Sequence, residues 1–270
     1  MWTALKLILY YFGYQLGFSA ANSVISAFIS PIDTTTSISV AMVASTLAMT
    51  WHLIRFKYVD LTNDKYKKLN LNTVLVSVVF VYTATTTLNL LIEQAGIPDT
   101  MAHTFISMSH TPLGMLTIAL LAPLSEEFLF RGAIERHLLH SWKNPWAAII
   151  VSSFIFGIVH MNPAQIPFAF LMGTMFGWLY WRTGSLLPGI IGHVLNNYLA
   201  AIHMRRYGET PLEEHIHSTL AVWILIATLA TACLFIAKWL HNHLDRDNAS
   251  TNDNCGKKVS DDYQRSEKQE

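Results

Sequence analysis

Long apolar stretches alternate with short polar ones along this chain. Each stretch comes close to the roughly 17–25 residues with which a helix crosses about 30 Å of hydrocarbon. The alternating pattern of a membrane β-barrel is absent, so helices are the expected spanning elements. The predicted spans are approximately Trp2–Ile25, Ile38–Ile54, Asn72–Ile92, Leu113–Leu139, Trp146–Met161, Gln165–Trp181, Leu187–Ile202 and Thr219–Trp239. We therefore expect an all-α polytopic membrane protein with about eight transmembrane helices.

The composition agrees with this pattern and narrows the class of partner. Hydrophobic residues make up 52% of the 270 residues and charged residues only 13%, against about 25% charged residues in a typical soluble domain. The formal net charge is zero, so no basic surface indicates a nucleic-acid partner. Two cysteines, Cys233 and Cys255, give neither a disulfide framework nor a cysteine metal site. The lipid bilayer is the first expected partner.

The distribution of lysine and arginine predicts the orientation. These residues gather in alternate loops, with Arg55, Lys57, Lys65, Lys67 and Lys68 between the second and third spans. The intervening loops hold only Arg205 and Arg206. Positive residues favour the cytoplasmic side, so both termini are expected in the cytoplasm, and short loops without organelle signals suggest a bacterial inner-membrane protein. An alternative for the first span is a cleaved signal peptide, but it is long, aromatic-rich and opens a multi-span chain.

Three regions follow from these patterns. Residues 1–71 form N-terminal helices and a cytoplasmic loop. Residues 72–240 form a core and a last helix, with the chemically interesting motifs between residues 112 and 204. Residues 241–270 form a polar cytoplasmic tail, expected to be disordered because large apolar residues are scarce there.

Three charged residues stand out inside the apolar fourth span. Glu126, Glu127 and Arg131 occur in "SEEFLFRG", where an ionised group costs several kcal/mol unless it is paired or hydrated. Glu127 and Arg131 are four residues apart and can neutralise each other across one helical turn. Glu126 points about 100° away around the helix. One carboxylate is thus predicted to be paired, and the other to be available for chemistry.

Two other apolar spans also carry polar groups. "FGIVH" places His160 one turn after Phe156, and "HVLNN" places His193 and Asn197 on one helix face. A single histidine of this kind is usually a packing residue, but several such groups on different spans favour a shared site. The small residues of "GTMFG", Gly173 to Gly177, are interpreted as a close helix-packing surface.

The three motifs together resemble those of the CAAX-protease and bacteriocin-processing family. "EEFLFR", "FGIVH" and "HVLNN" match its EExxxR, FxxxH and HxxxN motifs in order and spacing. This family includes type II CAAX prenyl endopeptidases and bacterial Abi proteins. The resemblance covers about a third of the chain and implies a helical intramembrane protease whose site opens toward the cytoplasmic leaflet.

The resemblance also implies a role for each motif residue. Glu126 is similar to the catalytic glutamate, and His160 to its partner on the attacking water. His193 and Asn197 are similar to the groups that hold the oxyanion. The supporting residues are Glu127, Arg131 and Phe156.

Elementary chemistry is consistent with this assignment. A carboxylate in a low-dielectric cavity can act as a general base, and a histidine and an asparagine aimed at a carbonyl oxygen stabilise its developing charge. The alternative is zinc held by Glu126, His160 and His193, although the H-E-x-x-H motif is absent. We expect a metal-free glutamate mechanism without a cofactor.

The substrate and the competing functions stay open at this point. The expected partner is a membrane-associated peptide or protein, without a requirement for prenylation. One alternative is a catalytically silent binding or immunity protein. Another is a proton-coupled transporter, which would need acids spread over several spans, whereas Glu126 and Glu127 are the only acids expected well inside one.

Overall fold

The protein is described by a computed structural model that covers residues 2–28, 33–59, 69–216 and 218–267. Within these ranges every regular element is a helix, as predicted. In chain order they are α1 (Trp2–Phe28), α2 (Thr34–Arg55), α3 (Leu71–Gln94), α4 (Ala102–Ser109), α5 (Pro112–Leu116), η2 (Thr117–Leu121), α6 (Ala122–Glu127), η3 (Phe128–Glu135), α7 (Arg136–Ser141), α8 (Pro145–Ile158), α9 (Gln165–Thr183), α10 (Leu187–Tyr207), η4 (Leu212–Ile216) and α11 (Thr219–Glu267).

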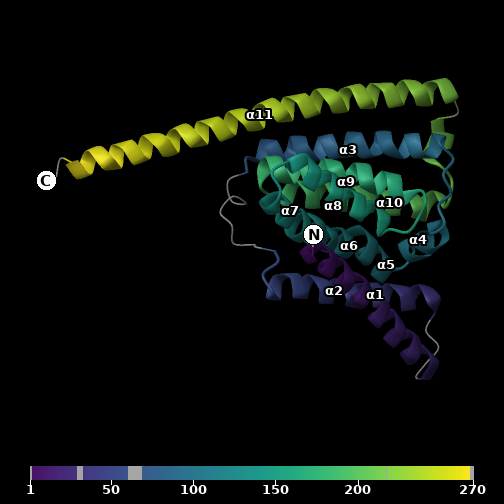
Figure 1. Cartoon of the computed structure of the whole chain (residues 1–270). Helices are drawn as coiled ribbons and strands as arrows, with labels where there is room; N and C mark the ends of the chain where they lie inside the picture. The colour runs from purple at the N-terminus through teal and green to yellow at the C-terminus, as the bar shows by residue number, and fades with distance from the viewer. Residues whose placement is uncertain (1, 29–32, 60–68, 217, 268–270) are drawn as a thin grey trace.

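The helices form a bundle whose centre is built from α6 to α10. Figure 1 shows α3 and α11 side by side along one edge of this centre, and α1 crossing α2 on the opposite edge. Apolar side chains from nearly all of these helices meet in one core, which includes Leu129, Phe130, Phe156 and Phe176. Each central helix therefore reaches the interior, where the motif residues lie.

Each of the eight predicted spans overlaps a helix of the structure. Within the described residues, four helical segments are long and apolar enough to cross a membrane: Thr34–Arg55, Leu71–Gln94, Pro112–Ser141 and Thr219–Leu244. These segments and the polytopic helical fold agree with a multi-pass membrane protein. The helices of the other four predicted spans, α1, α8, α9 and α10, lie within the same bundle, and the total of eight crossings stays a prediction.

The ends of the helices follow ordinary capping chemistry. The Asp33 carboxylate accepts a hydrogen bond of 2.9 Å from the Thr36 backbone N–H at the start of α2. This hydrogen bond holds the pKa of the Asp33 carboxyl below its usual value. Asn70 and Asn144 cap α3 and α8 in the same way.

The fourth predicted span is one continuous helix with two π-helical stretches, η2 and η3. In η2, the Ala122 N–H donates to Thr117 O, five residues back. The next residue, Pro123, has no N–H, so it cannot serve the Ile118 carbonyl. The turn just before Pro123 is therefore wider than an ordinary α-helical turn. π-Helical turns of this kind are frequent at functional sites.

The last helix, α11, does not end where the polar tail begins. The structure continues α11 to Glu267, well past the bundle (Figure 1). A helix without tertiary packing is marginal in water, so the expected disorder of residues 241–270 stays a prediction. Lys65, Lys67 and Lys68, which helped to predict the orientation, lie outside the described residues.

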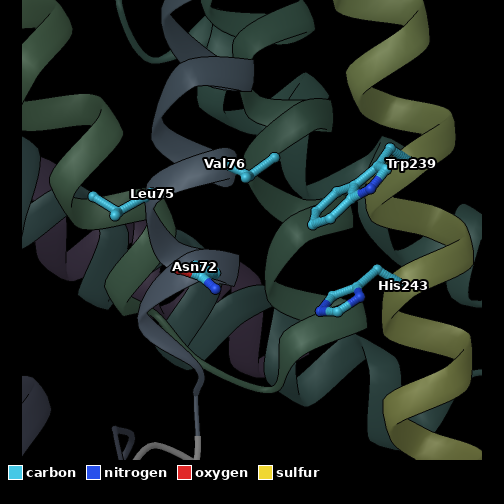
Figure 2. A pocket seen from close by; sticks show the side chains of 5 residues that line it. All are labelled: Asn72, Leu75, Val76, Trp239 and His243. Atoms are coloured by element: carbon cyan, nitrogen blue, oxygen red, sulfur yellow. The ribbon is translucent and has the colours of Figure 1, made fainter.

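A groove of about 340 Å³ lies between α3 and α11. Figure 2 shows Trp239 and His243 reaching from α11 toward Asn72, Leu75 and Val76 on α3. The Trp239 and His243 rings stack with their centroids 4.7 Å apart. No residue of the three sequence motifs lines this groove.

Candidate active site

The predicted pair of Glu127 and Arg131 is present and buried. Arg131 Nη1 donates to Glu127 Oε1 at 3.0 Å, and each residue is only 1% exposed. The same Glu127 oxygen lies 3.0 Å from His193 Nδ1. A carboxylate can only accept, so His193 carries a proton on Nδ1 when Glu127 is ionised. Glu127 thus fixes the orientation of both an arginine and a histidine.

Glu126 lies on the other side of His193. Its Oε2 is 3.7 Å from His193 Nε2, and its side chain is 16% exposed. The expected proximity of Glu126 and His193 is therefore found, with the two glutamates at opposite nitrogens of one imidazole. No cation for Glu126 was evident from its own helix; its neighbour comes from α10.

His160 lies just beyond the end of α8 and is fixed by its own turn. Its Nδ1 is 2.7 Å from the Phe156 carbonyl oxygen. A carbonyl can only accept, so Nδ1 carries the hydrogen and Nε2 of the neutral ring is left as an acceptor. The Phe156 ring centroid is 4.9 Å from that of His160 and 6.0 Å from that of His193. Phe156 therefore contacts both histidines.

Aromatic rings also enclose the buried arginine. Arg131 Cζ is 4.4 Å from the Phe156 ring centroid and 5.4 Å from that of Phe176. The Phe176 ring is tilted against His193 at 5.2 Å. These contacts stabilise a guanidinium away from water through cation–π attraction. They explain why the FxxxH motif begins with an aromatic residue.

Asn197 has a structural partner in addition to its predicted role. Its Nδ2 donates to the Ile118 carbonyl at 3.1 Å, the group that the π-helical turn and Pro123 leave without a helical donor. Its Oδ1 accepts from Asn196 Nδ2 at 3.1 Å. One N–H of Asn197 Nδ2 remains for another acceptor. This hydrogen bond ties α10 to the helix that carries the glutamates.

Comparisons with known proteins find the same segment. Residues 108–199 match the family model described as Rce1-like type II CAAX prenyl endopeptidase. The membrane protein YdiL of Bacillus subtilis (strain 168) is 33% identical over 91 residues, which cover 34% of this chain and 37% of YdiL. The membrane-embedded CAAX protease MroQ of Staphylococcus aureus (strain USA300) is 35% identical over 96 residues, covering 34% of this chain and 39% of MroQ. No solved structure matches.

Residues 108–199, the CAAX-protease segment, are thus similar to proteins of this family. The matched residues span less than two fifths of the length of these curated relatives. They contain the EExxxR and FxxxH motifs and the HxxxN motif, and hence the residues whose geometry is given above. The CAAX-protease segment includes the α6–η3 helix, α8 and α9, and most of α10.

One buried acid of the CAAX-protease segment was missed from the sequence. Glu135 lies at the end of η3 with 0% exposure, so the expectation that Glu126 and Glu127 are the only acids well inside a span is wrong. Its position four residues after Arg131 was the available signal.

The glycines of "GTMFG" also do more than expected. A methyl group on Gly173 would lie 3.0 Å from Arg131 Nη2, and one on Gly177 would lie 3.0 Å from the Glu135 carboxyl carbon. The predicted close approach is present, but the glycines face polar side chains rather than only an apolar helix surface.

A second missed residue comes from outside the matched segment. Tyr11 of α1 lies close enough to Glu126 for an electrostatic interaction, and Gln15 lies one helical turn further along α1. Gln15 Oε1 in turn accepts from the buried Ser45 hydroxyl of α2 at 3.3 Å. Nothing in the sequence motifs links Tyr11 to the site, because the link depends on how α1 packs across the core.

The residues of the zinc alternative do not fit a metal in this arrangement. Among the described residues, no three His, Cys, Asp or Glu side chains lie close enough to share one ion. Glu126 and His193 are adjacent, but His160 does not complete a group of three with them.

Proposed function

We propose that this protein is an intramembrane endopeptidase that hydrolyses a peptide bond with a water activated by Glu126. The observation that carries this proposal is the position of His193 between two glutamates. Glu127 holds it through Nδ1, while Nε2 faces Glu126. One carboxylate is committed to structure, and the other, partly exposed, faces the space where a substrate would bind.

The first step requires a base and a way to hold water. Glu126 takes a proton from water as the oxygen attacks the carbonyl carbon of the peptide bond. His160 is suited to hold this water, because its Nδ1–H is engaged by Phe156 and its Nε2 can accept a hydrogen bond. General-base catalysis of this kind contributes typically about 10²–10⁴ in rate.

The second step requires donors for the oxyanion of the tetrahedral intermediate. The free N–H of Asn197 Nδ2 can donate, and so can Nε2 of His193 in its imidazolium form. Glu126 then returns its proton to the leaving nitrogen as the C–N bond breaks. The products are a carboxylate and an amine, and no cofactor is consumed.

The proposed substrate is a membrane-associated peptide or protein. The name of MroQ describes a CAAX protease, and we extend protease activity, but not a prenylated substrate, to this chain. We also propose a bacterial inner-membrane location with both termini in the cytoplasm. A reporter fused after Lys68 or Glu270 should read cytoplasmic, and one fused near Glu209 should read external.

The test is a comparison of peptides produced by membranes that contain the intact protein or Glu126→Ala. Loss of specific cleavage products in the variant supports the proposal, and prenylated and unprenylated forms of an accepted peptide then define the substrate. Activity that survives a strong chelator supports the metal-free mechanism, and activity lost to the chelator and restored by zinc contradicts it.

Two other functions give different results in the same assay. A binding or immunity protein would retain its peptide partner without cutting it, with or without Glu126. A proton-coupled transporter would acidify or alkalinise vesicles on addition of its substrate. Burial of Glu135 adds one acid to the span but places it on the same helix, so acids are still not spread over several spans.

A further inference from the structure

A buried asparagine follows His160 by two residues and belongs to none of the three motifs. Asn162 is 0% exposed. Its Nδ2 donates to Asp99 Oδ1 at 2.7 Å, and its Oδ1 accepts from the Thr100 backbone N–H at 3.3 Å. Asp99 and Thr100 lie in the loop between α3 and α4. Both polar atoms of the Asn162 side chain therefore bind one loop that is distant in the sequence.

The carboxylate that receives this hydrogen bond is fixed by its own loop. Asp99 Oδ1 also accepts from the Met101 backbone N–H at 2.9 Å, just before α4. The helix α4 packs against α10, which carries His193. Asp99 precedes the matched residues 108–199, so the similarity to the family does not include it. The bond from Asn162 thus joins the turn after α8 to a segment that contacts the helix of the third motif.

The chain between His160 and Asn162 has little conformational freedom. Met161 is the one residue between them, and its φ is +49°, in a region that few side chains adopt readily. Pro163 follows Asn162, and a residue before proline is restricted in its own backbone angles. A displacement of Asn162 would therefore also displace His160.

The start of α9 does not require the Asn162 side chain. The backbone carbonyl oxygen of Asn162 accepts from the N–H groups of Gln165 and Ile166 at 3.0 and 2.9 Å, and any residue could supply this oxygen. The bond from His160 Nδ1 to Phe156 orients the ring within its own turn. It does not set where that turn lies relative to the other helices, whereas the side-chain bonds of Asn162 do.

We propose that Asn162 and Asp99 are positioning residues of the active site, which hold the turn that carries His160. This inference rests on the proposed peptidase function, in which His160 holds the attacking water. Neither residue needs to touch the substrate, because both act through the location of His160. A misplacement of about 1 Å caused by a distant substitution can lower a rate about 100-fold, so such an anchor affects catalysis.

The kinetic test begins with Asp99→Ala. The Asp99 side chain is exposed, so its removal leaves the apolar core unchanged and the variant should accumulate. We expect kcat to fall about 10–100-fold because the turn is no longer held. KM should change little, since the substrate keeps its own contacts. Normal kcat in Asp99→Ala overturns the proposal.

An exchange of donor and acceptor tests the hydrogen bond itself. Asn162→Asp places a second carboxylate against Asp99, and like charges so close repel, so kcat should again fall. Adding Asp99→Asn restores a donor opposite an acceptor, and the double variant should recover most of the lost kcat. A double variant no faster than Asn162→Asp overturns the proposal. If Asn162→Asp does not accumulate, Asp99→Ala decides.

The matched control is Asn144→Asp at the other end of α8. Asn144 is exposed and accepts a hydrogen bond of 3.0 Å from the Trp146 backbone N–H. Aspartate serves as well as asparagine at the start of a helix, so the same substitution should leave kcat and the melting temperature unchanged there. An equal loss of kcat in Asn144→Asp would show that the effect is not specific to Asn162, and would overturn the proposal.

A second readout does not depend on proteolysis. Amide hydrogen exchange in detergent is measured for residues 157–162, where the His160 N–H donates to Gly157 O at 3.2 Å. Exchange in this segment should be faster in Asp99→Ala than in the unmodified protein, with the other helices unchanged. Unchanged exchange there overturns the anchor. Absence of cleavage by the unmodified protein would refute the proposed peptidase function alone, because the exchange measurement still tests how the turn is held.

Discussion

The two adjacent glutamates of the EExxxR motif lie in contrasting surroundings. Glu127 is 1% exposed and bonds Arg131 and His193 at 3.0 Å each. Glu126 is 16% exposed and lies 3.7 Å from the other nitrogen of His193. A rotation of about 100° around a helix separates neighbouring residues. That rotation directs one carboxylate into the helix packing and the other toward accessible space.

We interpret this contrast as a structural role for Glu127 and a catalytic role for Glu126. On the Glu127 side of His193, Arg131 packs against the rings of Phe156 and Phe176. On the other side, the Glu126 carboxylate lies farther from His193 than Glu127 does. Its side chain is partly exposed, so the carboxylate can contact water. A motif written as one unit therefore contains two functions, and substitutions should distinguish them.

The largest expected effect on stability comes from Glu127→Gln. The substitution leaves Arg131 buried without its carboxylate partner, and breaking a buried ion pair costs about 3–5 kcal/mol. The variant should accumulate poorly and melt at a lower temperature in detergent, with activity falling as a consequence. A fully stable but inactive Glu127→Gln protein would show that Glu127 takes part in the reaction.

The sequence predicts local features of the site better than contacts between separate helices. Apolar periodicity locates all eight helical segments, and the i, i+4 spacing predicts the Glu127–Arg131 pair, because both depend on local geometry. The meeting of Glu126 with His193 was expected only from polar residues on separate spans. Tyr11 and the bond from Asn197 to Ile118 could not be predicted, since they depend on helix packing and on a π-helical turn that shifts the backbone donors.

A smaller effect is expected from Asn197→Ala, which removes the donor to Ile118 O. A buried acceptor left without a partner costs about 1–3 kcal/mol. Pro123→Ala restores a backbone N–H five residues after Ile118 and should reduce that cost. The measurement is the melting temperature of both single variants and the double variant. Strictly additive losses would mean that Pro123 does not create the need for Asn197.

The smallest expected effect comes from a substitution at Met161, the residue that follows His160. Met161 is 73% exposed and has φ of +49°, a left-handed conformation that costs a side chain about 1–2 kcal/mol. Met161→Gly should relieve part of this cost and raise the melting temperature slightly. A lower melting temperature would mean that the Met161 side chain makes stabilising contacts that outweigh the strain.

The most direct test of the central claim is the pairing of thermal stability with cleavage rate in Glu126→Gln. Glutamine keeps the shape of Glu126 and removes only its ability to accept a proton. The protein should accumulate and melt like the unmodified protein, while cleavage of an accepted peptide falls by about 10²–10⁴. Near-normal cleavage, or a melting temperature as low as that of Glu127→Gln, would contradict the assignment of Glu126 to the reaction and Glu127 to the structure.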